Sequence, residues 1–237
     1  MDKVETIFDL LDAWRGLPSY QLERRADIFF AFYLPEIIKG CFNEDITHDS
    51  IIPEYPLKKA GNRQSNKVDY AVFCKERIYL IELKTDSNSL NETQHEYLKE
   101  AKSKSLFDLI SIIPEIAIGS EQREKYMHLI GCLKKVLCKT YGIKITSESN
   151  VSDTKKKAFD ALMQEFDENK KDFDANKTDI EIVYIVPKND ENVEKSKIKE
   201  IGKIITFEEI RKWLPDSAKR FRESLKVWDD THILIQE

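Results

Sequence analysis

The feature that most constrains the fold is a pair of apolar, β-prone runs with only two polar residues between them. Residues 68–74 make up the first run, residues 77–85 make up the second, and Lys75-Glu76 separates them. Two such runs joined by so short a loop predict an antiparallel hairpin. The second run is apolar at consecutive positions, including Leu80 and Ile81, which is typical of a strand buried on both faces.

Asp69, Glu82 and Lys84 are charged residues within the apolar parts of this hairpin. Alternate residues of a strand share a face, so Glu82 and Lys84 should project to the same side of the sheet. With a two-residue loop, the antiparallel register places Asp69 opposite Glu82, with Cβ atoms roughly 4.5–5.5 Å apart. A loop longer or shorter by one residue would break this pairing. The alternative is a surface hairpin in which Glu82 and Lys84 form an exposed salt bridge.

Two facing carboxylates indicate a particular chemistry. They repel each other unless a divalent cation lies between them, and hard oxygen ligands favour Mg²⁺ or Mn²⁺. Lys84, two residues after Glu82, could orient an attacking water or offset negative charge on a phosphate. The residues therefore favour metal-dependent chemistry on a phosphate group.

The order of these residues resembles a known motif. Asp69, followed on the next strand by Glu82-Leu83-Lys84, is similar to the signature of the PD-(D/E)XK nuclease superfamily. The next predicted helix contains Gln94-His95-Glu96-Tyr97, which resembles the Gln…Tyr signature of the RecB-like branch. The chain departs from the pattern in two ways. Val68 stands in place of the proline, and Gln94 and Tyr97 are three residues apart rather than four.

The resemblance implies both a fold and an activity. The expected fold is a restriction-endonuclease-like α/β core, a central mixed β-sheet flanked by helices, and the expected activity is Mg²⁺-dependent (or Mn²⁺-dependent) hydrolysis of phosphodiester bonds in DNA. It implies that Asp69 and Glu82 are metal ligands and that Lys84 is the catalytic lysine. Gln94 would organise the active site, and Tyr97 would contact the nucleic-acid backbone.

Basic residues outnumber acids around the motif, although the whole chain is acidic. The formal net charge is −5, from 38 basic and 43 acidic residues, whereas residues 58–84 carry seven basic and three acidic residues. Phosphate binding depends on such local charge, so Lys58 and Lys67 are candidate substrate-binding residues. Glu54, from the preceding extended segment, is a candidate third metal ligand. The alternative for each is an ordinary residue on a solvated strand.

Other acids lie upstream on the first helix that the pattern indicates. Glu23 and Asp27 are four residues apart, and we expect both on the solvated face, although one carboxylate could reach the site. Pro35 should end or kink this helix, which starts near Pro18-Ser19. Glu36 should then lie in the first turn of a new helix, where an acid is favourable.

The rest of the chain predicts further helices and strands. Residues 50–57 should be extended, at a sheet edge or at a bulge, because of their prolines. Residues 89–113 should be a helix broken before Pro114. Other apolar patterns predict helices over 126–137 and 159–173, strands over 180–186 and 203–207, and a helix over 208–228. We expect one α/β domain over residues 1–237 with a charged helical insertion around 120–179.

Several classes of protein are excluded or disfavoured. No apolar run approaches the roughly 18 residues that a membrane-spanning helix needs, and no secretory signal is expected at the N-terminus. The four cysteines form no Cys-x-x-Cys pair, which disfavours a disulfide scaffold and suits a cytoplasmic location. The seven glycines form no phosphate-binding or dinucleotide-binding motif.

We expect a nucleic-acid partner, DNA before RNA, and a homodimer is possible by analogy with the superfamily. The alternative function is an inactive nuclease-fold module that binds nucleic acid or a protein partner. The sequence leaves open which kind of nucleic acid is cut and whether cleavage is internal or from an end.

Overall fold

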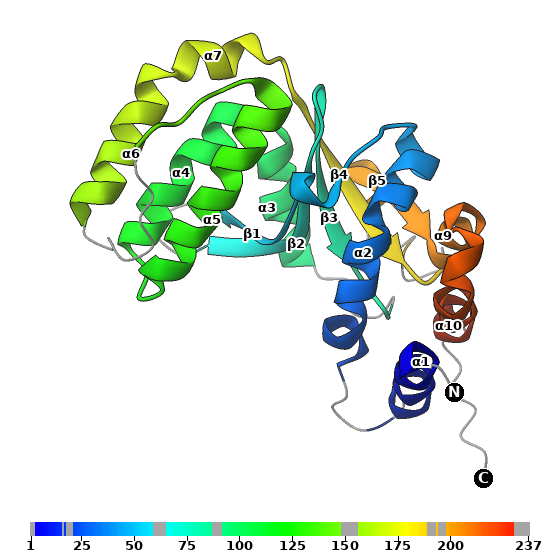
Figure 1. The fold of residues 1–237 in the computed structure, drawn as a ribbon. Coiled ribbons are helices and arrows are strands. Elements are labelled where there is room, and N and C mark those ends of the chain that lie inside the picture. The colour runs from blue at the N-terminus through cyan, green and yellow to red at the C-terminus, as the bar shows by residue number, and fades with distance from the viewer. Residues whose placement is uncertain are drawn as a thin grey trace. The chain divides into compact units, whose positions relative to one another are not determined.

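The computed structural model describes residues 3–15, 17, 21–58, 65–86, 92–147, 156–188, 193 and 198–229 of the 237-residue chain. Its architecture is α/β, with a five-stranded mixed sheet in the order β1-β2-β3-β4-β5 and helices that flank it (Figure 1). The predicted fold class is confirmed at this level. The finer, restriction-endonuclease-like arrangement stays a prediction.

The strands lie close to where the sequence predicts them. Their bounds are Ile51–Lys58 (β1), Ser65–Phe73 (β2), Arg77–Leu83 (β3), Asp179–Val186 (β4) and Gly202–Thr206 (β5). β1 is an edge strand and pairs antiparallel with β2. This confirms the edge position that Pro53 and Pro56 predict, because a proline at an edge removes no ladder hydrogen bond. The Cys74 amide donates to the Arg77 carbonyl at 2.8 Å, so the loop between β2 and β3 has the two residues that the sequence predicts.

The chain divides into two compact units. The first comprises residues 1–48, 81–92 and 183–237, and the second comprises residues 49–80 and 93–182. A short 3-10 helix, η1 (His48–Ser50), spans the boundary between residues 48 and 49.

The second unit contains most of the helices in the middle of the chain. These are α3 (Glu92–Lys102), α4 (Leu106–Ile118), α5 (Arg123–Val136), the π-helix η3 (Leu137–Tyr141), α6 (Lys156–Glu168) and α7 (Lys170–Ala175). The apolar helix α4 packs against α5, α6, α7 and β1, as Figure 1 shows for the three helices. The Tyr55 hydroxyl on β1 donates to the Leu109 carbonyl of α4 at 2.8 Å, which satisfies a buried polar group between strand and helix.

The first unit has an aromatic core. Its helices are α1 (Lys3–Trp14), α2 (Leu22–Phe42), α9 (Phe207–Trp213) and α10 (Lys219–Asp229), with short 3-10 helices η4 (Ile198–Glu200) and η5 (Asp216–Ala218). The Phe8 ring of α1 lies 4.4 Å from the Phe29 ring of α2, and the Phe30 ring lies edge-on 5.3 Å from the Phe221 ring of α10. Such pairs contribute free energy beyond the area that they bury.

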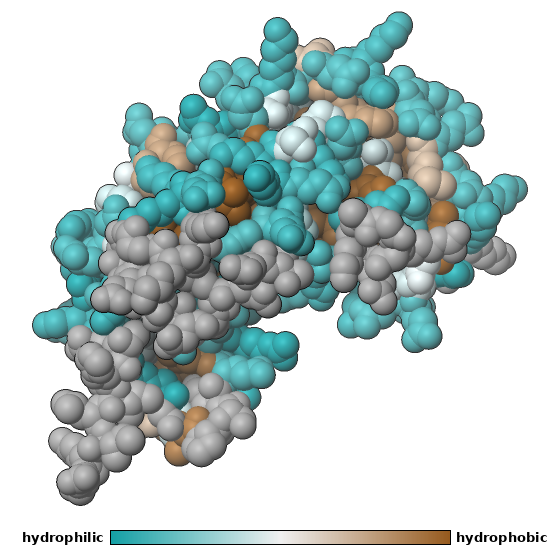
Figure 2. Space-filling model, turned by 180° about the vertical axis from the view of Figure 1, so that it is seen from behind, coloured by the Kyte–Doolittle hydropathy of each residue, from teal (hydrophilic) through white to brown (hydrophobic). Residues whose placement is uncertain are grey.

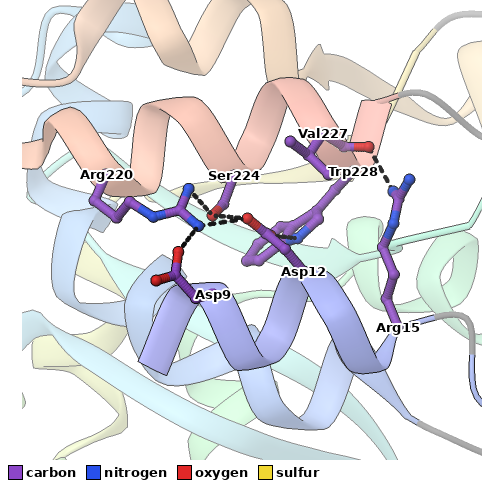
Figure 3. Close-up of polar contacts among 7 residues, drawn as sticks. All are labelled: Asp9, Asp12, Arg15, Arg220, Ser224, Val227 and Trp228. Atoms are coloured by element: carbon purple, nitrogen blue, oxygen red, sulfur yellow. Dashed lines mark hydrogen bonds and ion pairs between the residues drawn. The ribbon is translucent and has the colours of Figure 1, made fainter. Parts of the chain in front are cut away.

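A polar cluster joins α1 to α10 (Figure 3). The Asp12 carboxylate accepts hydrogen bonds from Arg220 Nη2 at 2.7 Å, from Trp228 Nε1 at 2.7 Å and from Ser224 Oγ at 3.2 Å. Arg220 Nη2 also donates to Asp9 at 2.7 Å. Burial lowers the Arg220 pKa, but hydrogen bonds to Asp12 and Asp9 and their opposite charge together raise it above its ordinary value. α1 was not predicted from the sequence.

Two prolines lie inside helices, so Pro35 does not end its helix and the predicted break before Pro114 is wrong, while a kink at Pro35 stays a prediction. α2 continues through Pro35 to Phe42, so Glu36 lies inside this helix rather than in the first turn of another. Burial of the α2 residues around Pro35, such as Leu34 and Ile37, both 0% exposed, offsets the cost of the missing hydrogen bond, about 3 kcal/mol. α4 likewise contains Pro114.

The predicted helix over residues 89–113 is broken earlier than expected. α3 ends at Lys102, and Ser105 begins α4. The Ser105 side chain accepts a hydrogen bond from the Asp108 amide at 3.1 Å, while the Asp108 carboxylate accepts one from the Ser105 amide at 3.0 Å. This capping box satisfies two amides at the start of α4. The local cap therefore decides the break, not Pro114.

Hydrophilic residues cover most of the described surface on the face shown in Figure 2, and hydrophobic residues form separate patches there. This agrees with the 34% of charged residues in the sequence. Within the described ranges, every helix is too short or too polar to cross a bilayer.

Candidate active site

The end of β3 carries a buried ion pair in the first unit. Lys84 Nζ lies 2.8 Å from Glu82 Oε1, and the side chains of Lys84 and Glu82 are only 6% and 3% exposed. The Lys84 amide donates to the Ile185 carbonyl at 2.8 Å, which ties this end of β3 to β4. The two side chains do pair with each other, but their burial contradicts the alternative of an exposed surface salt bridge.

Glu23 of α2 lies beside this ion pair. Burial raises the pKa of the Glu23 carboxyl, although the positive charge of Lys84, a hydrogen bond from the Thr85 backbone and the charge of Arg24 lower it. The expectation that Glu23 lies on the solvated face of the helix was therefore wrong. Asp27, one turn later, is exposed as predicted, and its carboxylate accepts a hydrogen bond from the Ile28 amide at 2.6 Å.

From the sequence, Glu23 was named as an acid that could reach the site, but a solvated position was favoured although the chain contained a signal for its burial. Residues three and seven positions further along a helix lie on nearly the same face. For Glu23 these are Ala26 and Phe30, both 0% exposed. A carboxylate in an apolar stripe is more informative than one on a polar face, because its burial needs a partner.

The second unit holds the other predicted acids. Asp69 lies on β2 and is half-buried. The β1–β2 register pairs Pro53 with Tyr70 and Tyr55 with Val68, so Glu54 occupies the position opposite Asp69. Opposed residues of an antiparallel pair lie close together.

Glu54 departs from ordinary strand geometry. Its φ is 51°, in the left-handed region, which non-glycine residues rarely adopt and which is often found at functional sites. The Glu54 carboxylate forms an ion pair with Lys67 at 2.9 Å, and both side chains are exposed, at 66% and 57%. Lys67 and Asp69 share one face of β2 because they are two residues apart.

The other predicted substrate-binding residues have internal partners in the second unit. The Tyr97 hydroxyl on α3 donates to the Lys67 carbonyl at 3.2 Å, so α3 is attached to β2 near Asp69. Lys58 forms an ion pair with Glu115 of α4 at 2.8 Å. A phosphate would have to compete with Glu115 for Lys58. Gln94 belongs to α3, but its side chain lies outside the described part of the structure.

The pairing of Asp69 with Glu82 stays a prediction. Asp69 belongs to the second unit and Glu82 to the first, on strands that are neighbours in the sheet. The observed turn supports the predicted register, because the hydrogen bond between Cys74 and Arg77 closes a loop of two residues.

The donor groups suit one kind of metal better than others. Among the described residues, no three side chains of His, Cys, Asp or Glu gather as a metal cage. Mg²⁺ rarely uses such a cage. It retains several waters and binds through one or two carboxylates together with substrate phosphates. Asp69, Glu82 and Glu54 each carry a hard oxygen donor of this kind, whereas zinc would favour Cys and His ligands.

Comparisons of the chain with protein-family models, with curated proteins and with solved structures found no match. The likeness to the PD-(D/E)XK superfamily therefore rests on the residues of the motif.

Proposed function

We propose that this chain is a Mg²⁺-dependent nuclease of the PD-(D/E)XK superfamily that hydrolyses phosphodiester bonds in DNA. The observation that carries the proposal is the buried Glu82–Lys84 ion pair, at 2.8 Å, with the Glu23 carboxylate beside it. All three residues are ionisable, and they lie where an apolar strand ends. Perturbed and buried ionisable groups concentrate at functional sites.

Stability alone is a poor explanation for this pair. Burial of two charges costs several kcal/mol for each ion, and apolar residues of similar volume often serve a fold as well or better. Ile81 and Leu83, the neighbours of Glu82 on β3, are 0% and 1% exposed, so the strand accommodates apolar side chains. A function that needs a fixed positive charge gives a reason to retain the pair.

The residues of the chain would have distinct roles. Glu82 holds the Lys84 ammonium in place through Oε1, so little reorganisation is needed when negative charge develops on a phosphate oxygen. Asp69 and Glu82 would be the main metal ligands and Glu54 a third, and Mg²⁺ would supply charge neutralisation and an activated water when bound. Glu23 would hold Lys84 from the side of α2, and Tyr97 would keep α3 against β2.

The exposure of Lys67 supports a role in binding a DNA phosphate. Its ion pair with Glu54 is exposed, and such pairs contribute only about 0.2–1 kcal/mol. A DNA phosphate could therefore replace Glu54 as the partner of Lys67 at little cost in free energy. The Glu54 carboxylate could then bind the metal. Lys58 is a weaker candidate, because Glu115 already binds it.

The alternative is an inactive module with the same fold. In that case the basic residues near β2 would bind nucleic acid without cleavage, and binding would still weaken steeply with added salt. A homodimer would be compatible with both functions, and its only support is analogy with the superfamily.

The decisive experiment is a cleavage assay with Mg²⁺ or Mn²⁺ on single-stranded DNA, double-stranded DNA and RNA, with a chelator as a blank. We expect cleavage of DNA that Asp69→Asn and Lys84→Met each reduce by roughly 100-fold or more. Asp160→Asn, the same change at an exposed position of α6, should cleave like the wild type. Salt-dependent binding without cleavage by the wild type would favour the inactive module.

A further inference from the structure

A surface cavity that is open to solvent lies at the C-terminal end of α2 and takes no part in the proposed cleavage. Its volume is about 360 Å³, which lies within the range of small-molecule sites. Residues of the first unit line it, from the last turns of α2, from the loop that follows and from the end of α9. Those that matter here are Glu36, Lys39, Gly40, Asp45 and Trp213.

Trp213 forms an aromatic wall because residue 40 is glycine. A Cβ atom at Gly40 would lie only 2.1 Å from Cγ of the Trp213 ring, so the indole lies directly against the backbone of α2. A tryptophan face attracts cations and flat guanidinium groups.

The charges in the cavity also favour a cation. Lys39 is already paired with Asp45 at 2.7 Å, which leaves Glu36 as the remaining charged side chain of the lining. Glu36 Oε2 is enclosed and accepts no hydrogen bond from the described residues. A buried acceptor without a donor is costly, and the C-terminal end of a helix carries partial negative charge.

The same end of α2 already binds one cation of the chain. Lys203 Nζ lies 3.3 Å from the Cys41 carbonyl and 4.7 Å from the centroid of the Phe42 ring. This contact combines a helix carbonyl, an aromatic ring and an ammonium group. The cavity offers a similar combination to a cation from outside.

We propose that this cavity binds an organic cation with N–H donors, above all a guanidinium group. Glu36 supplies the opposing negative charge, and Trp213 stacks on its plane. The group can belong to a free small molecule or to an arginine side chain of a peptide. The proposal is independent of the nuclease activity.

The test is a titration of the full chain with N-acetyl-arginine amide, followed by the indole N–H signal of Trp213 in NMR spectra. The chain has three tryptophans, and Trp213→Phe assigns the signal. N-acetyl-citrulline amide has nearly the same shape without the charge. We expect saturable binding of the arginine compound, and binding of the citrulline compound that is weaker by about tenfold or more. This comparison needs no variant.

Three variants sharpen the test. Glu36→Gln should weaken binding by about tenfold or more, whereas Glu208→Gln should bind like the wild type. Glu208 is exposed on α9 and pairs with Lys212 at 2.8 Å, so its variant removes the same charge outside the cavity. Trp213→Leu, followed by calorimetry, should also lose binding.

Three results would overturn the proposal: no shift of the Trp213 signal, equal affinity for the citrulline compound, or unchanged binding by Glu36→Gln. A Gly-Arg-Gly peptide distinguishes the two sources of the cation. Tighter binding than that of the amide supports a peptide side chain, and equal binding supports a small molecule.

Discussion

Two carboxylate–lysine pairs of nearly equal length have opposite environments. Glu82–Lys84 spans 2.8 Å with side chains that are 3% and 6% exposed, whereas Glu54–Lys67 spans 2.9 Å with side chains that are 66% and 57% exposed. Water screens the second pair and competes for its groups, but the first has lost its hydration and depends on its partner. A Glu–Lys ion pair is thus fixed in the buried place, whereas in the exposed place its groups can exchange partners.

The largest loss of stability is expected from breaking the buried Glu82–Lys84 pair. Lys84→Met leaves the Glu82 charge without its partner, so we expect a loss of about 3–5 kcal/mol in the free energy of unfolding. Urea denaturation measures it. The double variant Glu82→Gln/Lys84→Met removes both charges and should recover much of the loss. Lys75→Met, at the exposed hairpin turn, is the matched control, and a similar loss there would contradict the argument from burial.

An intermediate effect is expected at a carboxylate that is partly exposed but has several donors. Glu165 of α6 accepts hydrogen bonds from Thr146 Oγ1 at 2.7 Å and from the Ser147 amide at 2.9 Å, among others. Despite burial, hydrogen bonds from Ser147 and Thr146 lower its pKa from 4.5 to about 2. Glu165→Gln should cost roughly 1–2 kcal/mol near neutral pH.

The pH dependence of Glu165 has a definite sign. Because the pKa is lower in the folded state, the stabilisation is complete above the unfolded value of 4.5 and is lost as the pH falls toward about 2. The difference between wild type and Glu165→Gln in urea denaturation should therefore shrink between about pH 7 and about pH 3. A difference that stays constant over this range would show that the charge of Glu165 is not the cause.

A smaller effect of opposite sign is expected at Glu54. Its φ of 51° costs a non-glycine residue about 1–2 kcal/mol, which glycine avoids. Glu54→Gly should therefore be as stable as the wild type or more so, up to about 1 kcal/mol, while cleavage falls. Glu54→Val should be less stable. If Glu54→Gly keeps full cleavage, the strain at this position has no role in the site.

The smallest effect is expected from breaking the exposed pair. Lys67→Met should change the free energy of unfolding by less than about 1 kcal/mol, but DNA binding should weaken and its dependence on salt should become less steep. Fluorescence anisotropy at several salt concentrations measures both. A stability loss as large as that of Lys84→Met would contradict the comparison of the two pairs.

The sequence predicted the strands better than the helix boundaries. Alternation and short apolar runs located β1 to β5, because burial of one or both faces constrains every residue of a strand. Helix ends depended on competing local effects. Pro35 did not end α2, since buried neighbours offset its cost, and the capping box at Ser105 ended the predicted helix earlier than Pro114 would.

Only part of the candidate site was predicted, because the local pattern of a strand locates its own residues but not a residue from a distant helix. Glu82 and Lys84 were found because charges are conspicuous in an apolar strand, and the two-residue turn at Cys74 and Arg77 agrees with the predicted register. Glu23 was expected to be solvated. Its apolar helix face indicates burial, but Glu23 comes from a helix about sixty residues away, and no local pattern links that helix to Lys84.

The order of residues alone determined which groups are available: two strands, a short turn, an acid on the first and an acid and a lysine on the second. Periodicity sufficed for this, since the face of a strand residue follows from its position. Only the tertiary structure decided which charged side chains are buried away from solvent. Burial depends on distant helices, and it makes Glu82–Lys84 a rigid pair and leaves Glu54–Lys67 exchangeable.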